Sequence, residues 1–124
     1  MNRRFAFLMF CTFLISCAWA TPQHPSWIEG DWEGVLKYPE GNFRVILHVT
    51  SDENGLHASM DDPDQAKVLV IDSIVLDGNA LTFQMRAIRA RFNGTANAKE
   101  INGTLYQVEY VIPVKLSRIP NKHG

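Results

Sequence analysis

Two histidines lie where a folded sheet could bring them together. His48 and His57 belong to two runs of alternating apolar and polar residues, separated by the turn-forming residues 51–55. If Val49 pairs with Leu56, His48 lies directly opposite His57 on the outer face, about 5 Å away. Two such imidazoles could bind a metal ion or respond to pH, but a metal site needs further ligands and none is evident. We therefore expect two exposed histidines, no metal site and no cofactor.

Three carboxylates are close together in the segment 61–67, which reads DDPDQAK. They could bind calcium, but the segment lacks the glycine and the distal glutamate of a calcium-binding loop. Aspartate and proline also suit a turn, so we expect a connection between strands, not a strand. At an open rim these acids could instead face basic residues and orient a polar ligand group, although mixed charges also simply keep a surface soluble. The acids are Asp61, Asp62 and Asp64, and the basic residues are Arg86, Arg89 and Arg91.

The chain offers no obvious nucleophile for catalysis. It has no G-x-S-x-G motif, the nucleophile elbow of α/β-hydrolases. Both cysteines, Cys11 and Cys17, lie within the first twenty residues. Any catalysis would depend on histidines or carboxylates, and we predict that the protein is not an enzyme.

The first twenty residues have the pattern of an export signal. Two arginines precede an apolar run, residues 5–15, and Ala18-Trp19-Ala20 is a cleavage site of the A-x-A type, which we favour. Alternatively, the residues Leu14 to Cys17 resemble a bacterial lipobox, which would leave a lipid on Cys17. The first interpretation predicts a periplasmic or secreted protein, and the second a lipid-anchored protein of the bacterial envelope. The apolar run is shorter than the roughly 20 residues that span a bilayer, so we expect membrane attachment only through that lipid.

The rest of the chain has the size and charge of one small acidic domain. Without residues 1–20 it holds ten basic and thirteen acidic residues, a net charge of −3 with neutral histidines, which argues against a nucleic-acid partner. Residues 21–27 contain two prolines and suit an extended tether, and residues 120–124 form a short tail. We expect the domain to occupy residues 28–119.

These residues alternate between apolar and polar types with a period of two, interrupted by short turns. The pattern predicts an all-β domain of eight antiparallel strands, joined up and down and closed into a barrel. An open sandwich is the alternative. We expect one strand over 68–76, apolar on both faces at its start, with Ile74 and Leu76 inward, and Gly78-Asn79 as a two-residue hairpin turn.

One end of this barrel is expected to be plugged. Closing the last strand beside the first brings the inward Arg118 near the inward Trp32, a cation-π contact worth about 0.5–2 kcal/mol. Gly30 lets the backbone turn tightly before the tryptophan. Three inward glycines near that end could leave room for the two large side chains. They are Gly34, Gly94 and Gly103.

The opening GDW and the late arginine resemble the lipocalin-type barrels, which share a G-x-W first strand and an arginine packed across it. Residues 28–119 also resemble a small domain of uncertain function that is fused ahead of secreted bacterial α/β-hydrolases. The similar segments are GDWEGVL, ILHVT, MDDPDQAK, IDSIVLDGNALTF, FNGT, INGTL and PVKLSR. The resemblance implies a lipocalin-like barrel and, through the fused arrangement, an interaction with a hydrolase.

The end opposite the plug is the predicted binding end. There the topology gathers the segments 39–42, 61–67, 87–90 and 108–110. The candidate ligand-binding residues are Tyr38, Phe43, Met60, Asp61, Asp62, Asp64, Met85, Arg89 and Phe92. Eight short strands enclose an interior that side chains can fill, so we expect a filled core rather than a large cavity. We predict an exported, non-enzymatic barrel that binds a small apolar or amphipathic ligand, or alternatively a module that docks a separately encoded envelope hydrolase.

Overall fold

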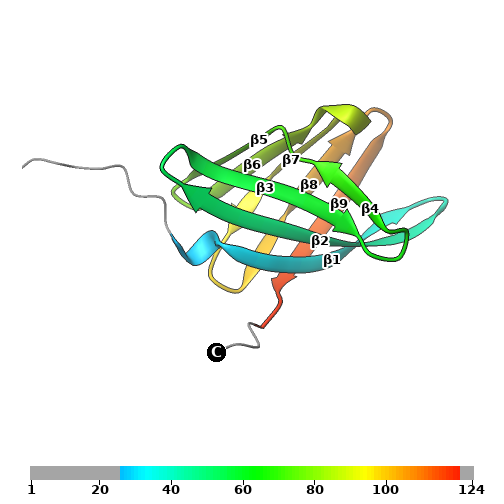
Figure 1. Cartoon of the computed structure of the whole chain (residues 1–124). Helices are drawn as coiled ribbons and strands as arrows, with labels where there is room; N and C mark the ends of the chain where they lie inside the picture. Colours follow the sequence, from blue (N-terminus) through cyan, green and yellow to red (C-terminus); the bar gives the residue numbers. More distant parts are fainter. Residues whose placement is uncertain (1–25, 121–124) are drawn as a thin grey trace, which may run out of the picture.

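The computed structural model describes residues 26–120 (Figure 1). The predicted signal peptide, most of the predicted tether 21–27 and residues 121–124 of the predicted tail lie outside the described residues. The described part is all-β: nine antiparallel strands form one sheet that curls into a half-barrel. The strands are β1 (Gly30–Tyr38), β2 (Gly41–Asp52), β3 (Gly55–Asp62), β4 (Lys67–Val70), β5 (Ser73–Asp77), β6 (Ala80–Met85), β7 (Ala90–Ala96), β8 (Glu100–Gln107) and β9 (Tyr110–Arg118).

Two short 3₁₀ helices, η1 (Ser26–Ile28) and η2 (Arg86–Ile88), accompany these strands in the described range. Neither is long or apolar enough to cross a membrane. Almost every strand pairs with its neighbours in sequence, as an up-and-down meander predicts, and β1 also pairs with β9. The sheet order is therefore β4-β3-β2-β1-β9-β8-β7-β6-β5, and the strands β1 to β4 cross over β5 to β9 in Figure 1.

The predicted single strand over 68–76 is wrong, because the chain bends at residues 71–72 and forms two strands. β4 pairs only with β3, whereas β5 pairs only with β6. The residues that face the core are odd-numbered before the bend, Leu69 and Ile71, and even-numbered after it, Ile74 and Leu76. The chain thus passes from one edge of the sheet to the other, and this bend accounts for nine strands where the sequence predicted eight. The sheet is open between β4 and β5, so the predicted closed barrel is not formed there.

The aspartate at the bend holds β5 against β6. The Asp72 backbone N–H donates to the Gln84 carbonyl at 2.8 Å. Its carboxylate accepts a hydrogen bond from the Arg86 backbone N–H at 2.6 Å. A free N–H at the start of η2 is satisfied in this way.

The interior is filled by side chains, as expected. Trp32, Leu47 and Phe92 are fully buried, and Phe92 stacks on Phe83 with ring centroids 4.8 Å apart. The core extends along the inward positions of all the strands. Its burial supplies the main stabilisation of a domain whose described part contains no cysteine.

The segment 61–67 was predicted to lie outside any strand, and this is wrong at both of its ends. β3 continues through Asp62, and β4 begins at Lys67, so the turn contains only residues 63–66. Asp61 and Asp62 therefore point to opposite faces of β3. This alternation separates two carboxylates that the sequence places side by side.

Candidate functional site

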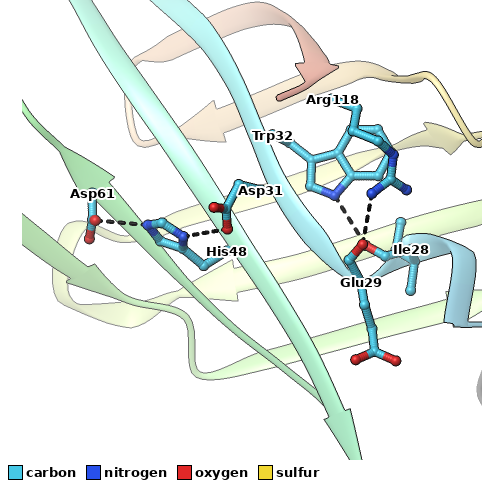
Figure 2. Close-up of polar contacts among 7 residues, drawn as sticks. All are labelled: Ile28, Glu29, Asp31, Trp32, His48, Asp61 and Arg118. Atoms are coloured by element: carbon cyan, nitrogen blue, oxygen red, sulfur yellow. Dashed lines mark hydrogen bonds and ion pairs between the residues drawn. The ribbon is translucent and has the colours of Figure 1, made fainter. Parts of the chain in front are cut away.

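The predicted plug is present at the end of the sheet where β1 begins (Figure 2). Trp32 pairs with Arg118 across β1 and β9, and the guanidinium carbon lies 4.2 Å from the centroid of the indole ring. The guanidinium donates to the carbonyls of Ala98 at 2.9 Å and Glu29 at 2.8 Å, and also to that of Trp27. One arginine therefore ties together three segments of backbone. This arrangement is structural, because each of the three guanidinium nitrogens donates to a backbone carbonyl of the fold.

The glycines near this end make room for different side chains than predicted. Gly30 has a φ of +128°, and a Cβ atom there would lie 2.6 Å from Arg118 Nη1, so this glycine does serve the plug. At Gly94 and Gly103, however, a Cβ atom would lie 2.6 Å from Phe92 Cζ. These two glycines pair across β7 and β8, where they admit the Phe92 ring and the close approach of the two backbones. At Gly34 a Cβ atom would meet the Lys115 carbonyl oxygen at 2.4 Å and Leu116 Cδ2 at 2.6 Å, so the predicted role of these three glycines in the plug is wrong.

The outer face carries a histidine held between two aspartates (Figure 2). His48 Nδ1 lies 2.7 Å from Asp31 Oδ1, and Nε2 lies 2.8 Å from Asp61 Oδ2. The three residues lie on the adjacent strands β2, β1 and β3. Burial alone would lower the pKa of His48, but the hydrogen bonds and charges of Asp31 and Asp61 together raise it above the ordinary value. Both ring nitrogens face carboxylate oxygens, which favours the doubly protonated imidazolium.

The predicted pairing of His48 with His57 is wrong. The β2–β3 hairpin pairs Asp52 with Gly55, which places His57 opposite Thr50 and His48 opposite Ser59. His57 contacts Asp52 instead, with Nε2 3.0 Å from Oδ1. Among residues 26–120 there is no group of three or more His, Cys, Asp or Glu side chains that could hold a metal ion.

A pocket of about 160 Å³ opens at the end opposite the plug. We call it the open-end pocket. Its polar lining residues are Tyr38, Asp62, Gln65 and Lys67. Its apolar lining residues are Leu36, Phe43, Val45, Leu69, Met85 and Ile88. The combination of apolar walls with a few polar groups is typical of a small-ligand site, although this pocket is smaller than the roughly 300–1,000 Å³ of most such sites.

Aromatic residues build the rim of the open-end pocket. The Tyr38 ring contacts Phe43 and Tyr110 edge to face, with centroids 5.5 Å and 5.2 Å apart. Partial burial, together with the charge of Glu40, raises the pKa of Tyr38 above its usual range. Its hydroxyl donates to the side-chain oxygen of Gln107. The rim is thus cross-linked between β1, β2 and β8–β9 without a ligand.

The structure brings together some of the predicted ligand-binding residues and separates others. Tyr38, Phe43, Asp62 and Met85 line the open-end pocket. Met60 and Phe92 are buried in the core and do not line it. Three charged residues lie elsewhere: Asp61 contacts His48 on the outer face, Asp64 is exposed 3.7 Å from Arg44, and Arg89 is exposed after η2.

Six lining residues were not predicted. Leu36 alternates in step with Tyr38, and Val45 with Phe43, both of which were predicted. Gln65 and Lys67 belong to the segment 61–67, so the sequence contained signals for all four. Leu69 and Ile88 depend on the bend before β5 and on η2, which the period-two pattern does not predict. Residues 68–71 are apolar at both odd and even positions, so alternation does not show where the inward positions change.

A wider groove of about 910 Å³ crosses the outer face over β1, β8 and β9. Its charged residues already have partners, since Glu33 lies 3.9 Å from Arg44 and Lys115 lies 3.4 Å from Glu100. No buried polar residue of the described chain lies in it, whereas the buried Asp62 lines the open-end pocket. The open-end pocket is therefore the better candidate site.

Comparison of the chain with protein-family models, with curated proteins and with solved structures found no match.

Proposed function

We propose that this protein is an exported, non-enzymatic binding domain that takes a small apolar or amphipathic molecule into the open-end pocket. The observation that carries the proposal is the pocket itself, an apolar chamber at the mouth of an otherwise filled half-barrel. Lipocalin-like barrels bind ligands at an open mouth, and the resemblance of the first and last strands to that family supports the same use here. The export signal of the sequence supports a location outside the cytoplasm.

A neutral fluorescent probe tests this proposal. N-phenyl-1-naphthylamine becomes bright in apolar surroundings, and its titration into the purified protein should give a saturable signal. Ile88→Trp places a large side chain in the open-end pocket and should weaken binding about tenfold or more. Val75→Trp adds the same side chain on the exposed outer face and serves as the control. Equal binding by both variants, or no saturable binding by the wild type, would overturn the proposal.

Native mass spectrometry provides an independent test. The protein is incubated with a lipid extract from a bacterial envelope, desalted and sprayed intact. We expect a bound species of defined mass in the wild type and its loss in Ile88→Trp. Wild-type protein that emerges with no adduct would count against a lipid-derived ligand.

A second candidate function is docking of a separately encoded hydrolase. β4 and β5 are the edge strands of the described sheet, and their outward residues Val68, Val70 and Val75 are 66%, 63% and 57% exposed. An exposed apolar edge can accept an extended segment of another protein as an additional strand. Esterase activity that co-purifies from envelope extract with the wild type, but not with Val68→Lys/Val70→Lys, would support docking. Equal recovery with both proteins, or none, would argue against it.

A further inference from the structure

One carboxyl group in the open-end pocket has an unsatisfied atom. Asp62 is only 6% exposed, and it is the one buried charged residue within 26–120. It lies at the end of β3 with the same inward parity as Met60, whereas its neighbour Asp61 faces outward to His48. Within the described part of the chain, Asp62 Oδ1 has no hydrogen-bond partner.

An unpaired buried carboxyl oxygen destabilises a fold, so it calls for a physical explanation. The cations nearest in register do not provide one. Lys67 lies directly opposite Asp62 in the β3–β4 ladder, yet it is exposed and makes no hydrogen bond to Oδ1. Arg44 is directed to Glu33 and Asp64, at 3.9 Å and 3.7 Å.

The residues that line the pocket with Asp62 indicate which class of molecule could donate a hydrogen bond to its carboxyl oxygen. Tyr38 and Phe43 give the same pocket aromatic surface, and Leu69 and Met85 give it aliphatic surface. Aromatic rings attract cations, and a carboxylate accepts hydrogen bonds from an ammonium group. A pocket of about 160 Å³ encloses only a short chain, and a larger molecule extends out through its open side.

We infer that the open-end pocket selects a small amphipathic amine, whose ammonium group donates a hydrogen bond to Asp62 Oδ1 while its short apolar chain lies along Leu69 and Met85. This inference rests on the proposed function, because it names the ligand class of the same pocket. Asp62 is then a specificity-determining residue. An alcohol of equal size can donate only an uncharged, weaker hydrogen bond to the carboxyl oxygen, and an anion adds a like charge, so both should bind more weakly.

Three ligands with the same carbon chain test the inference: hexylamine, hexan-1-ol and hexanoate. Each displaces N-phenyl-1-naphthylamine from the purified protein at pH 7. We expect the wild type to prefer hexylamine to hexanoate by about tenfold or more. The isosteric Asp62→Asn should abolish this preference while still binding hexan-1-ol. Asp64→Asn removes an exposed carboxylate of the adjacent turn and should leave the preference intact.

The outcomes separate this inference from the proposed function. A wild-type preference ratio near one would overturn the amine assignment, even if Asp62→Asn failed to fold. The amine assignment would also be overturned if Lys67→Met bound hexylamine and the wild type did not. That result would mean that Lys67 occupies the Asp62 carboxyl group in solution and that only its removal frees the site. If neither the probe nor hexan-1-ol binds the wild type, the proposed function itself fails.

Discussion

The guanidinium of Arg118 lies over the indole of Trp32, joining the last strand of the described sheet to the first. The same guanidinium donates to the Glu29 and Ala98 carbonyls, so it also secures the chain before β1 and the turn between β7 and β8. β1 and β9 share two paired positions, and the Ile119 N–H donates to the Asp31 carbonyl at 2.9 Å, so this side-chain contact reinforces a short ladder. The plug thus stabilises the fold at the end opposite the candidate pocket.

Replacement of this arginine should lower stability strongly. Arg118→Lys keeps the charge, but its compact ammonium group cannot span the three carbonyls that the planar guanidinium reaches, and we expect a loss of about 2 kcal/mol or more in the free energy of unfolding. Lys115→Ala removes an exposed cation of the same strand and should cost less than about 1 kcal/mol. Urea denaturation followed by tryptophan fluorescence measures both. Equal losses in the two variants would contradict the role given to Arg118.

Added volume at the paired glycines should be costly. A Cβ atom at Gly94 would meet the Asn102 carbonyl oxygen at 2.2 Å and Phe92 Cζ at 2.6 Å, so we expect Gly94→Ala to destabilise the fold by about 1–3 kcal/mol. The ring accounts for part of this cost and the Asn102 carbonyl for the rest, so combining Gly94→Ala with Phe92→Leu should cost less than the sum of the two single changes but more than Phe92→Leu alone. Thermal denaturation of the four proteins completes this double-mutant cycle. Strict additivity would show that the ring is not what excludes the methyl group.

The Asp31–His48–Asp61 cluster should make stability depend on pH. The folded-state pKa of His48 is raised above its unfolded value of about 6.5, so its contribution is fully present below that pH and is lost as pH rises through the folded pKa. With one-third of the side chain exposed, we expect no more than about 1 kcal/mol after solvent screening. His48→Gln should therefore be less stable than the wild type at pH 6 and closer to it at pH 9.

Urea denaturation of both proteins at the two pH values measures this effect. Asp61→Asn removes one of the two acceptors and should reproduce part of the loss at pH 6. A stability difference between wild type and His48→Gln that is the same at pH 6 and pH 9 would contradict the assignment.

The bend between β4 and β5 should depend on Asp72. Asp72→Ala removes the hydrogen bond to the Arg86 N–H, and we expect about 1 kcal/mol of destabilisation with faster hydrogen exchange in β5. Glu53→Ala, in the exposed β2–β3 turn, is the control. Hydrogen exchange resolved by mass spectrometry should show the change in β5 and β6 and leave β1 and β2 unaffected. Uniform acceleration across the sheet would indicate global destabilisation instead.

The amino-acid sequence by itself determined the all-β class, the antiparallel meander, the Gly78-Asn79 turn and the meeting of Trp32 with Arg118. These features depend on period-two alternation and on turn residues, which are local signals. Alternation also identified Tyr38, Phe43 and Met85 as inward residues near the pocket.

Only the tertiary structure decided the register of the β2–β3 hairpin, the bend at residues 71–72 and the separation of Asp61 from Asp62. A shift of two residues in a hairpin keeps every side chain on its face, so alternation cannot detect it, yet it moves His48 away from His57. The bend reverses the parity of a run that is apolar on both faces, where alternation carries no information. Whether a buried carboxyl oxygen finds a partner depends on which strands surround it, and for Asp62 that is a property of the assembled sheet.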